Sequence, residues 1–151
     1  TKIITGTSKG VGHAWNLVKL DGEFYHLDVT WDDPIYKSDE KSGIRYHYFN
    51  LTDDDISIDH QWDKSKYEAC TATKYNYYKY NNLVVKDQDD YIKRVIDEVH
   101  KGNTKIELKI LEPDPMKFNI NSAIDTIVNK LFLRCQYSYN KDVRIATVSF
   151  Y

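Results

Sequence analysis

The stretch GHAWNLVKLDGEFYHLDVTWDDP, Gly12 to Pro34, decides the fold prediction. Its centre is the pair Asp21-Gly22, which strand-forming residues flank on both sides. Such a pair is the strongest short-range signal of a β-hairpin, because a type I′ turn needs positive φ at both central residues. The sequence therefore predicts two antiparallel strands that a two-residue loop joins at Asp21-Gly22.

This loop also fixes the register of the two strands. Counting outward from it places His13 opposite Thr30 and Trp15 opposite Asp28, so His13 and Asp28 become diagonal neighbours on one face. Diagonal positions are about 7–8 Å apart at the backbone, a gap that an imidazole and a carboxylate can close to a hydrogen bond. The pair suits a catalytic base with its orienting group, and a purely structural hydrogen bond is the alternative. A one-residue slip in register would separate the two side chains.

The two faces of the predicted hairpin differ in chemistry. We expect one face to point toward a core; it carries Ala14, Val18, Leu20, Tyr25, Leu27 and Val29. We expect the other face to carry a site; it holds His13, Trp15, His26, Asp28 and Thr30, with Leu17, Lys19 and Phe24.

Length and charge limit the possible partners. A chain of 151 residues can bury one sizeable core or form two small lobes. Its net charge of -2 and its pI near 6.2 offer no basic field, so no nucleic-acid partner is expected. No apolar run approaches the roughly 20 residues that a membrane span needs. We therefore expect no membrane span.

The metal-binding residue types show no metal-site spacing. Cys70 and Cys135 fit neither a zinc motif nor a disulfide framework. His26, His47 and His60, together with Asp28, Asp32 or Asp33, are of ligand type but form no i,i+4 or C-x-x-C pattern. Asp32 and Asp33 are predicted as turn residues that bond their own backbone before Pro34. The sequence predicts no metal site and no cofactor.

Downstream of the hairpin, the prediction alternates loops and short elements. Ile35 to Arg45 reads as a surface loop, 46–50 as a short strand, and 51–63 as a loop that tucks His60 and Trp62 against the sheet. The second part, 73–151, is predicted to be a small α+β layer. It contains an aromatic strand over Tyr75 to Tyr80, a helix from the N-cap Asp87 to Gly102, a strand at 104–111, a helix at 122–131 and two closing strands.

The motifs HAWN, LDVTWDDP and DHQWD, in that order, resemble those of the bacterial transglutaminase-like superfamily, whose core is similar to that of papain-like cysteine proteases. The resemblance covers about Gly10 to Asp63. It implies an α+β protein in which residues 1–72 form the antiparallel sheet of a transglutaminase-like core and residues 73–151 form a C-terminal extension. Such proteins often belong to the cell envelope, so the resemblance also implies an extracellular or envelope location.

The family's mechanism uses a cysteine, a histidine and an aspartate in that chain order. By resemblance the catalytic histidine is His13, the aspartate is Asp28, and Trp15 and Trp31 are substrate-binding walls or packing. No cysteine precedes His13. The expectation is therefore the C-terminal part of an enzyme that acts on amide bonds of protein or peptide substrates, as peptidase or acyltransferase. This chain alone is expected to be inactive.

Other interpretations of the sequence stay open. Cys70 could complete the triad only in reversed chain order, and an ordinary buried thiol is favoured for it, as is a core position for Cys135. The chain could instead be a non-catalytic cell-surface module whose aromatic residues bind peptide or glycan. It could also associate with a partner fragment, or with itself, through a sheet face left exposed.

Overall fold

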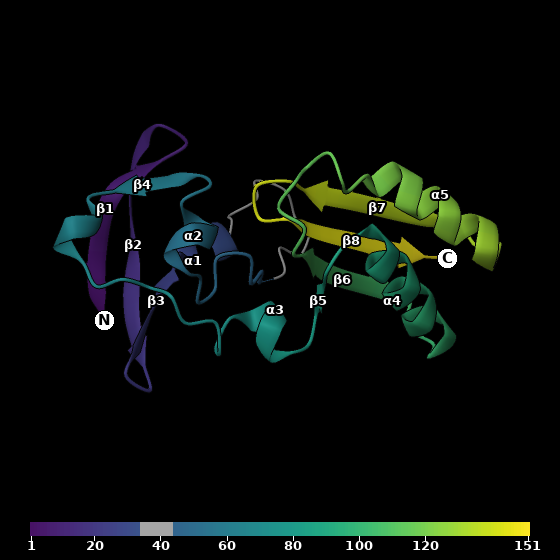
Figure 1. Cartoon of the computed structure of the whole chain (residues 1–151), viewed down its shortest axis with the longest axis horizontal. Helices are drawn as coiled ribbons and strands as arrows, with labels where there is room; N and C mark the ends of the chain where they lie inside the picture. Colours follow the sequence, from purple (N-terminus) through teal and green to yellow (C-terminus); the bar gives the residue numbers. More distant parts are fainter. Residues whose placement is uncertain (34–43) are drawn as a thin grey trace. The chain divides into compact units, whose positions relative to one another are not determined.

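The structure is a computed structural model and describes residues 1–33 and 44–151 of the chain (Figure 1). It is an α+β protein, as predicted, and divides into two compact units, Thr1–Asn81 and Asn82–Tyr151. Residues 73–81, which we assigned to the second part, lie in the first unit. Of the predicted loop from Ile35 to Arg45, residues 35–43 lie outside the described residues.

The first unit is built on a four-stranded antiparallel sheet with the order β3-β2-β1-β4. Its strands are β1 Lys2–Ser8, β2 Val11–Leu20, β3 Glu23–Leu27 and β4 His60–Trp62. The predicted hairpin is confirmed, because Leu20 pairs with Glu23 across a turn in which Asp21 has φ 49° and Gly22 has φ 87°. The register therefore follows from the turn chemistry.

The far end of the hairpin differs from the prediction. Strand β3 stops at Leu27, and Asp28 becomes the N-cap of a short helix, α1 Val29–Asp32. The predicted pairs His13 with Thr30 and Trp15 with Asp28 do not form. The Asp28 carboxylate accepts a hydrogen bond from the backbone N–H of Trp31 at 3.3 Å, which is the bond that makes aspartate a good N-cap.

The sequence did not predict β1 or β4. A second hairpin, through Lys9 and Gly10, pairs β1 with β2, and β4 pairs with the other edge of β1. Gly6 lies where these strands meet; a Cβ there would stand 2.1 Å from the carbonyl oxygen of Gln61. Only glycine lets β4 approach this closely.

The prediction of the covered face holds at Tyr25, which is fully buried, but not along β2. Ala14 and Leu20, expected in the core, are exposed, whereas Trp15 and Leu17 on the opposite face are buried. The reason is the segment after α1, which folds over the second face. It includes turns and bends at 47–50, within the range 46–50 where we predicted a strand, and a bridge between His26 and Leu51. It continues through the short helix α2 Asp53–Ile56 to β4.

The first unit ends with two single-turn helices, η1 Lys64–Lys66 and α3 Tyr77–Tyr80. The second lies in the region where we predicted an aromatic strand. Asn76 caps α3, since its side chain accepts from the backbone N–H of Lys79, and this cap favours helix over strand. No helix in the described ranges is long and apolar enough to cross a membrane.

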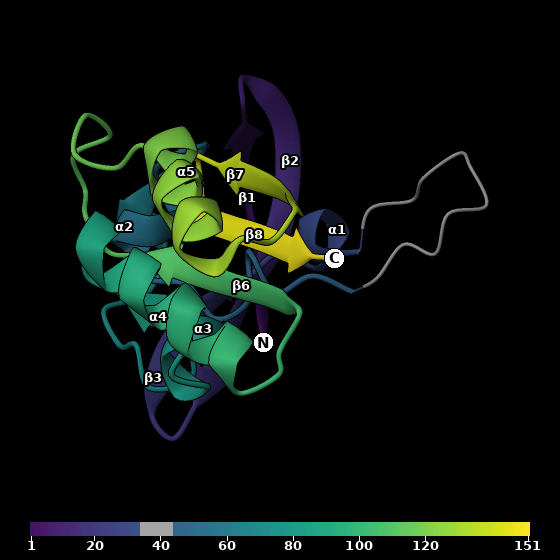
Figure 2. The same ribbon diagram turned by 90° about the vertical axis from the view of Figure 1, so that its right-hand side faces the viewer.

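From α4 onward the second unit follows the predicted sequence of elements, whereas β5 was not predicted. Its strands and helices are β5 Val84–Val85, α4 Gln88–His100, β6 Lys105–Ile110, α5 Ile120–Leu131, β7 Cys135–Asn140 and β8 Ile145–Phe150. The sheet order is β5-β6-β8-β7, and only the β5–β6 pair is parallel. Helices α4 and α5 cover one face of this sheet (Figure 2), where Tyr91, Val95, Ile124 and Ile127 are buried. The predicted N-cap Asp87 is confirmed.

Candidate functional site

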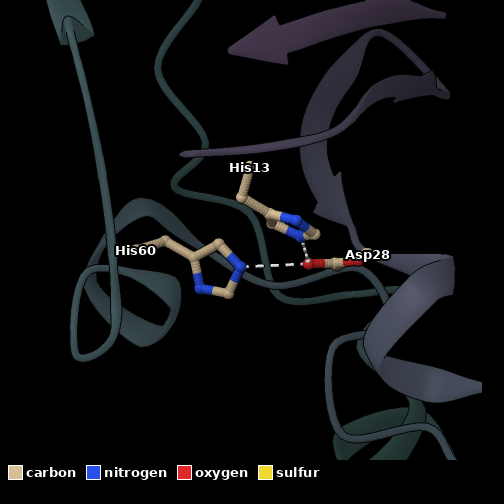
Figure 3. A group of neighbouring side chains, drawn as sticks. All are labelled: His13, Asp28 and His60. Carbon is tan, nitrogen blue, oxygen red and sulfur yellow. Dashed lines mark hydrogen bonds and ion pairs between the residues drawn. The ribbon is translucent and has the colours of Figure 1, made fainter. Parts of the chain in front are cut away.

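The candidate site centres on a contact between His13 and Asp28. The Nε2 atom of His13 lies 2.6 Å from Oδ2 of Asp28. Figure 3 draws this contact as a dashed line. His13 comes from β2 and Asp28 from the start of α1. The Asp28 side chain is fully buried, whereas that of His13 is 16% exposed. The structure therefore brings the two predicted site residues together, with the histidine on the accessible side.

A third side chain, His60, contacts the same carboxylate oxygen. Its Nε2 lies 3.0 Å from Oδ2 of Asp28, and its side chain is fully buried (Figure 3). The register of the strands explains why His60 lies beside His13. Ser8 pairs with both Val11 and His60, so these residues share a face of the sheet. His13 lies two residues after Val11 in β2 and is therefore on the same face. The sequence placed His60 against the sheet but did not join it to His13 and Asp28.

The hydrogen bonds continue beyond His60. Its Nδ1 lies 2.6 Å from Oδ1 of Asp59, and the other oxygen of Asp59 accepts from the Tyr48 hydroxyl at 2.5 Å. The backbone carbonyl of Tyr48 in turn accepts from the N–H of Asp28 at 3.1 Å. Asp28 is thus fixed at both its backbone and its side chain, and a fixed carboxylate orients its partner ring.

Charge in this network can be assigned from its geometry. Burial would raise the pKa of Asp28, but hydrogen bonds from His60 and His13 outweigh burial and leave this pKa below its usual value. Burial is likewise outweighed at Asp59, whose pKa is lowered by bonds from His60 and Tyr48. Both carboxylates are therefore ionised near neutral pH and can only accept hydrogen bonds.

His60 is consequently the cation of the network. Each of its ring nitrogens faces an ionised carboxylate, so each carries a hydrogen, which makes the ring an imidazolium. Burial alone would lower the pKa of His60, but the bonds to Asp28 and Asp59 raise it above its usual value. One positive charge thus lies between two negative ones in the buried part of the site.

His13 has a different arrangement. Because Asp28 only accepts, Nε2 of His13 carries a hydrogen, and in the neutral ring the lone pair then lies on Nδ1. Nδ1 is the atom that can take a proton from a reacting group. A carboxylate that holds one ring nitrogen while the other acts as base is the arrangement of a general acid–base histidine.

The two tryptophans that we predicted as walls of the site both contact the His13 ring. Trp15 stacks on it with ring centroids 6.0 Å apart, and Trp31 meets it edge-on at 6.1 Å. Trp15 is only 3% exposed, so packing is the role that its position allows. Trp31 is half-buried and is the one that can present a surface to a ligand.

A second histidine, aspartate and cysteine cluster lies in the same unit but is inert. The donor atoms of His26, Asp53 and Cys70 lie within 4.8 Å of one another. Trp15 Nε1–H donates to Nδ1 of His26 at 3.0 Å, so the ring hydrogen is on Nε2, which bonds Asp53 at 2.7 Å. His26 therefore has no lone pair left for a thiol proton.

Neither cysteine of the chain is an activated nucleophile. Burial, followed by the charge of Asp53, raises the pKa of the Cys70 thiol to about 12, so it stays protonated. Burial also raises the pKa of Cys135, which lies in β7 of the second unit. A nucleophilic thiolate needs the opposite shift.

Asp32 holds the segment that carries Tyr48. Its Oδ1 accepts from the backbone N–H of Tyr48 at 2.8 Å, so it bonds a distant segment. We had predicted that it would bond the backbone of its own turn. Burial raises the pKa of Asp32 to about 7. Asp33 is exposed and ends α1.

The first unit also contains a separate aromatic cavity of about 550 Å³. Its walls include Phe49, Tyr75, Tyr77 and Tyr80, with Asp21 and Asn50 as polar groups. The sequence predicted aromatic side chains here but not the cavity.

Comparison of the sequence with protein-family models finds no match, and comparison with curated proteins finds none either.

Proposed function

We propose that this chain supplies the histidine and aspartate of a transglutaminase-like cysteine enzyme that acts on amide bonds of proteins or peptides. The observation that carries the proposal is the 2.6 Å contact between His13 Nε2 and the buried carboxylate of Asp28. The sequence resemblance names the same two residues. A papain-like core for the first unit, and a place in the cell envelope or outside the cell, belong to the same proposal.

In this mechanism Nδ1 of His13 takes the proton from a cysteine thiol. The thiolate forms a bond to the amide carbon, and the amide nitrogen leaves with the proton that His13 then returns. Water or an amine next attacks the thioester carbon and regenerates the thiol. Cys70 is buried and protonated beside His26 and Asp53, and burial raises the pKa of Cys135, so the mechanism needs a cysteine other than these two.

Asp28 and His60 hold His13 ready for both proton transfers. Asp28 fixes the hydrogen of His13 on Nε2, so the lone pair is available on Nδ1. His60 positions Asp28 by donating to the same oxygen at 3.0 Å. We expect His60 to act as a positioning residue, because it is fully buried and has no surface for a substrate.

The experiment uses the protein as its gene encodes it, with turnover followed as peptide cleavage or ammonia release. His13→Ala should lower kcat by about 10²–10⁴-fold, the usual contribution of a general acid–base group. His100→Ala, at an exposed position of α4, is the matched control and should leave turnover unchanged. Retained turnover in a folded His13→Ala protein would remove His13 from the mechanism.

A second candidate function is binding of a glycan or peptide without catalysis. The aromatic cavity favours it, because Tyr75, Tyr77 and Tyr80 offer ring surfaces beside the polar groups of Asp21 and Asn50. Calorimetric titration with oligosaccharides and peptides tests it. Binding that Tyr80→Ala abolishes, in a protein without turnover, would favour this function over the enzyme.

A further inference from the structure

We propose that His13, Asp28 and His60 form a binding site for a divalent transition-metal ion, of which Zn²⁺ is the best match. The three donor atoms, two imidazole nitrogens and one carboxylate oxygen, lie within 4.8 Å of one another. They come from β2, from the start of α1 and from β4. Two histidines and one carboxylate are a common three-ligand set for zinc, which leaves the fourth position open.

The groups behind the donors are arranged as in a metal site. A metal-binding histidine usually donates its other ring N–H to a carboxylate, which fixes the tautomer and orientation of the ring. His60 has this partner, because its Nδ1 lies 2.6 Å from Asp59, and Tyr48 holds Asp59 from the other side. Asp28 is also held from behind, because the Trp31 N–H donates to its Oδ1. Its other oxygen, Oδ2, faces the rings of His13 and His60.

The neighbouring cluster shows what a site unsuited to metal looks like. His26, Asp53 and Cys70 are equally close together. Trp15, however, donates to Nδ1 of His26, and this bond places the hydrogen on the Nε2 atom that faces Asp53. A metal ion could bind there only after the buried indole had lost its acceptor. At His60 the outer nitrogen Nδ1 donates instead of accepting, so Nε2 can bind an ion once it has released its hydrogen to solvent.

An ion can enter with small movements. Around a tetrahedral ion with bonds of about 2.0–2.1 Å, neighbouring donors lie about 3.3 Å apart. Nε2 of His60 is already 3.0 Å from Oδ2 of Asp28, and Nε2 of His13 is 2.6 Å from it. The distance from Nε2 of His13 to Oδ2 of Asp28 must grow by about 0.7 Å, and the side chain of His13 is the partly exposed one.

A bound ion would regulate the proposed enzyme. It replaces the hydrogen bond through which Asp28 orients His13, so the metal-bound form cannot position the base. This consequence rests on the proposed function, but ion binding itself does not. Ion binding is measured without any substrate, so its failure and the failure of the enzyme proposal are distinguishable.

The test titrates the chelator-treated chain with Co²⁺, followed by visible absorption, and with Zn²⁺, followed by calorimetry. We expect one ion per chain and the visible absorption bands of tetrahedral Co²⁺. His60→Gln should weaken Zn²⁺ binding at least 100-fold, and Asp59→Asn, which keeps an acceptor for His60, should weaken it about 10–100-fold. His100→Gln should bind as the wild type does.

Folding is controlled by thermal unfolding of each variant without metal. His13→Gln, at the partly exposed ligand, provides a second variant that does not disturb the buried Asp59–His60 pair. Zn²⁺ binding of wild-type strength in His60→Gln and His13→Gln would overturn the proposal. So would the absence of both Co²⁺ absorption and Zn²⁺ binding in the wild type.

Discussion

The buried carboxyl of Asp32 makes the stability of the protein depend on pH in a direction that can be predicted. Asp32 is only 5% exposed, and its Oδ1 accepts from Tyr48 N–H at 2.8 Å. Its Oδ2 is buried and has no hydrogen-bond partner among the described residues. An ionised carboxylate is poorly solvated in this position, so burial raises the pKa of Asp32 to about 7.

The magnitude follows from the difference between folded and unfolded pKa values. A rise from the model-compound value of 3.8 to about 7 corresponds to about 4 kcal/mol. The folded state binds the proton more tightly, so the stabilising effect is fully present below pH 3.8 and is lost as pH rises through about 7. Above that pH the folded protein must hold a buried negative charge.

Asp32→Asn isolates this effect, because the amide keeps an acceptor for Tyr48 N–H but cannot ionise. We expect the free energy of unfolding of the variant, relative to wild type, to rise by up to about 4 kcal/mol between pH 4 and pH 8. Urea unfolding at several pH values measures this difference. Asp33→Asn, at the exposed neighbouring position, controls for the loss of one negative charge. A difference between Asp32→Asn and wild type that does not change with pH would refute the reasoning.

Two further substitutions test the two units. Gly6→Ala should cost about 1–3 kcal/mol in urea unfolding, because the added Cβ would stand 2.1 Å from the Gln61 carbonyl. Gly12→Ala, where a Cβ meets nothing within 4 Å, should cost much less, and equal costs would contradict the close approach of β4. In the second unit, Ile127→Ala removes a fully buried side chain of α5 and should cost about 2–5 kcal/mol, measured by urea unfolding with circular dichroism. A cost below about 1 kcal/mol would exclude Ile127 from a packed core.

Local signals predicted the first hairpin and the elements of the second unit from α4 onward. Asp21-Gly22 set the register of the first hairpin because its turn type allows few residues and one geometry. Asp87 and Gly102 marked the ends of α4 through the chemistry of caps and left-handed backbone. These features depend on neighbours in sequence, so the sequence alone was enough.

The contact between His13 and Asp28 was predicted from the register of a longer hairpin, and the structure confirms that register only as far as Leu27. We extended β3 through Asp28, whereas the structure ends this strand at Leu27. The following residues Val29 and Thr30 are β-branched, which favours a strand, but Asp28 is also a good N-cap. The contact with Tyr48 decides between strand and N-cap, because the Tyr48 carbonyl accepts a hydrogen bond from the Asp28 N–H. No local sequence pattern connects Tyr48 to Asp28.

The third member of the site could not be derived from local patterns. His60 reaches Asp28 only because β4 pairs with β1, and neither strand was predicted. Pairing between residues so far apart in sequence depends on packing of the whole unit. The same packing covers the face of Trp15 and Leu17 and leaves Ala14, which we expected in the core, exposed.

The central claim is that Asp28 holds the hydrogen of His13 on Nε2 and leaves Nδ1 as the base. Long-range ¹H–¹⁵N spectra of the histidine side chains measure this in the chain as it is. The account predicts that the hydrogen of the neutral His13 ring is on Nε2, and that the His60 ring carries a hydrogen on each nitrogen. A neutral His13 ring with its hydrogen on Nδ1, unchanged in Asp28→Asn, would contradict it.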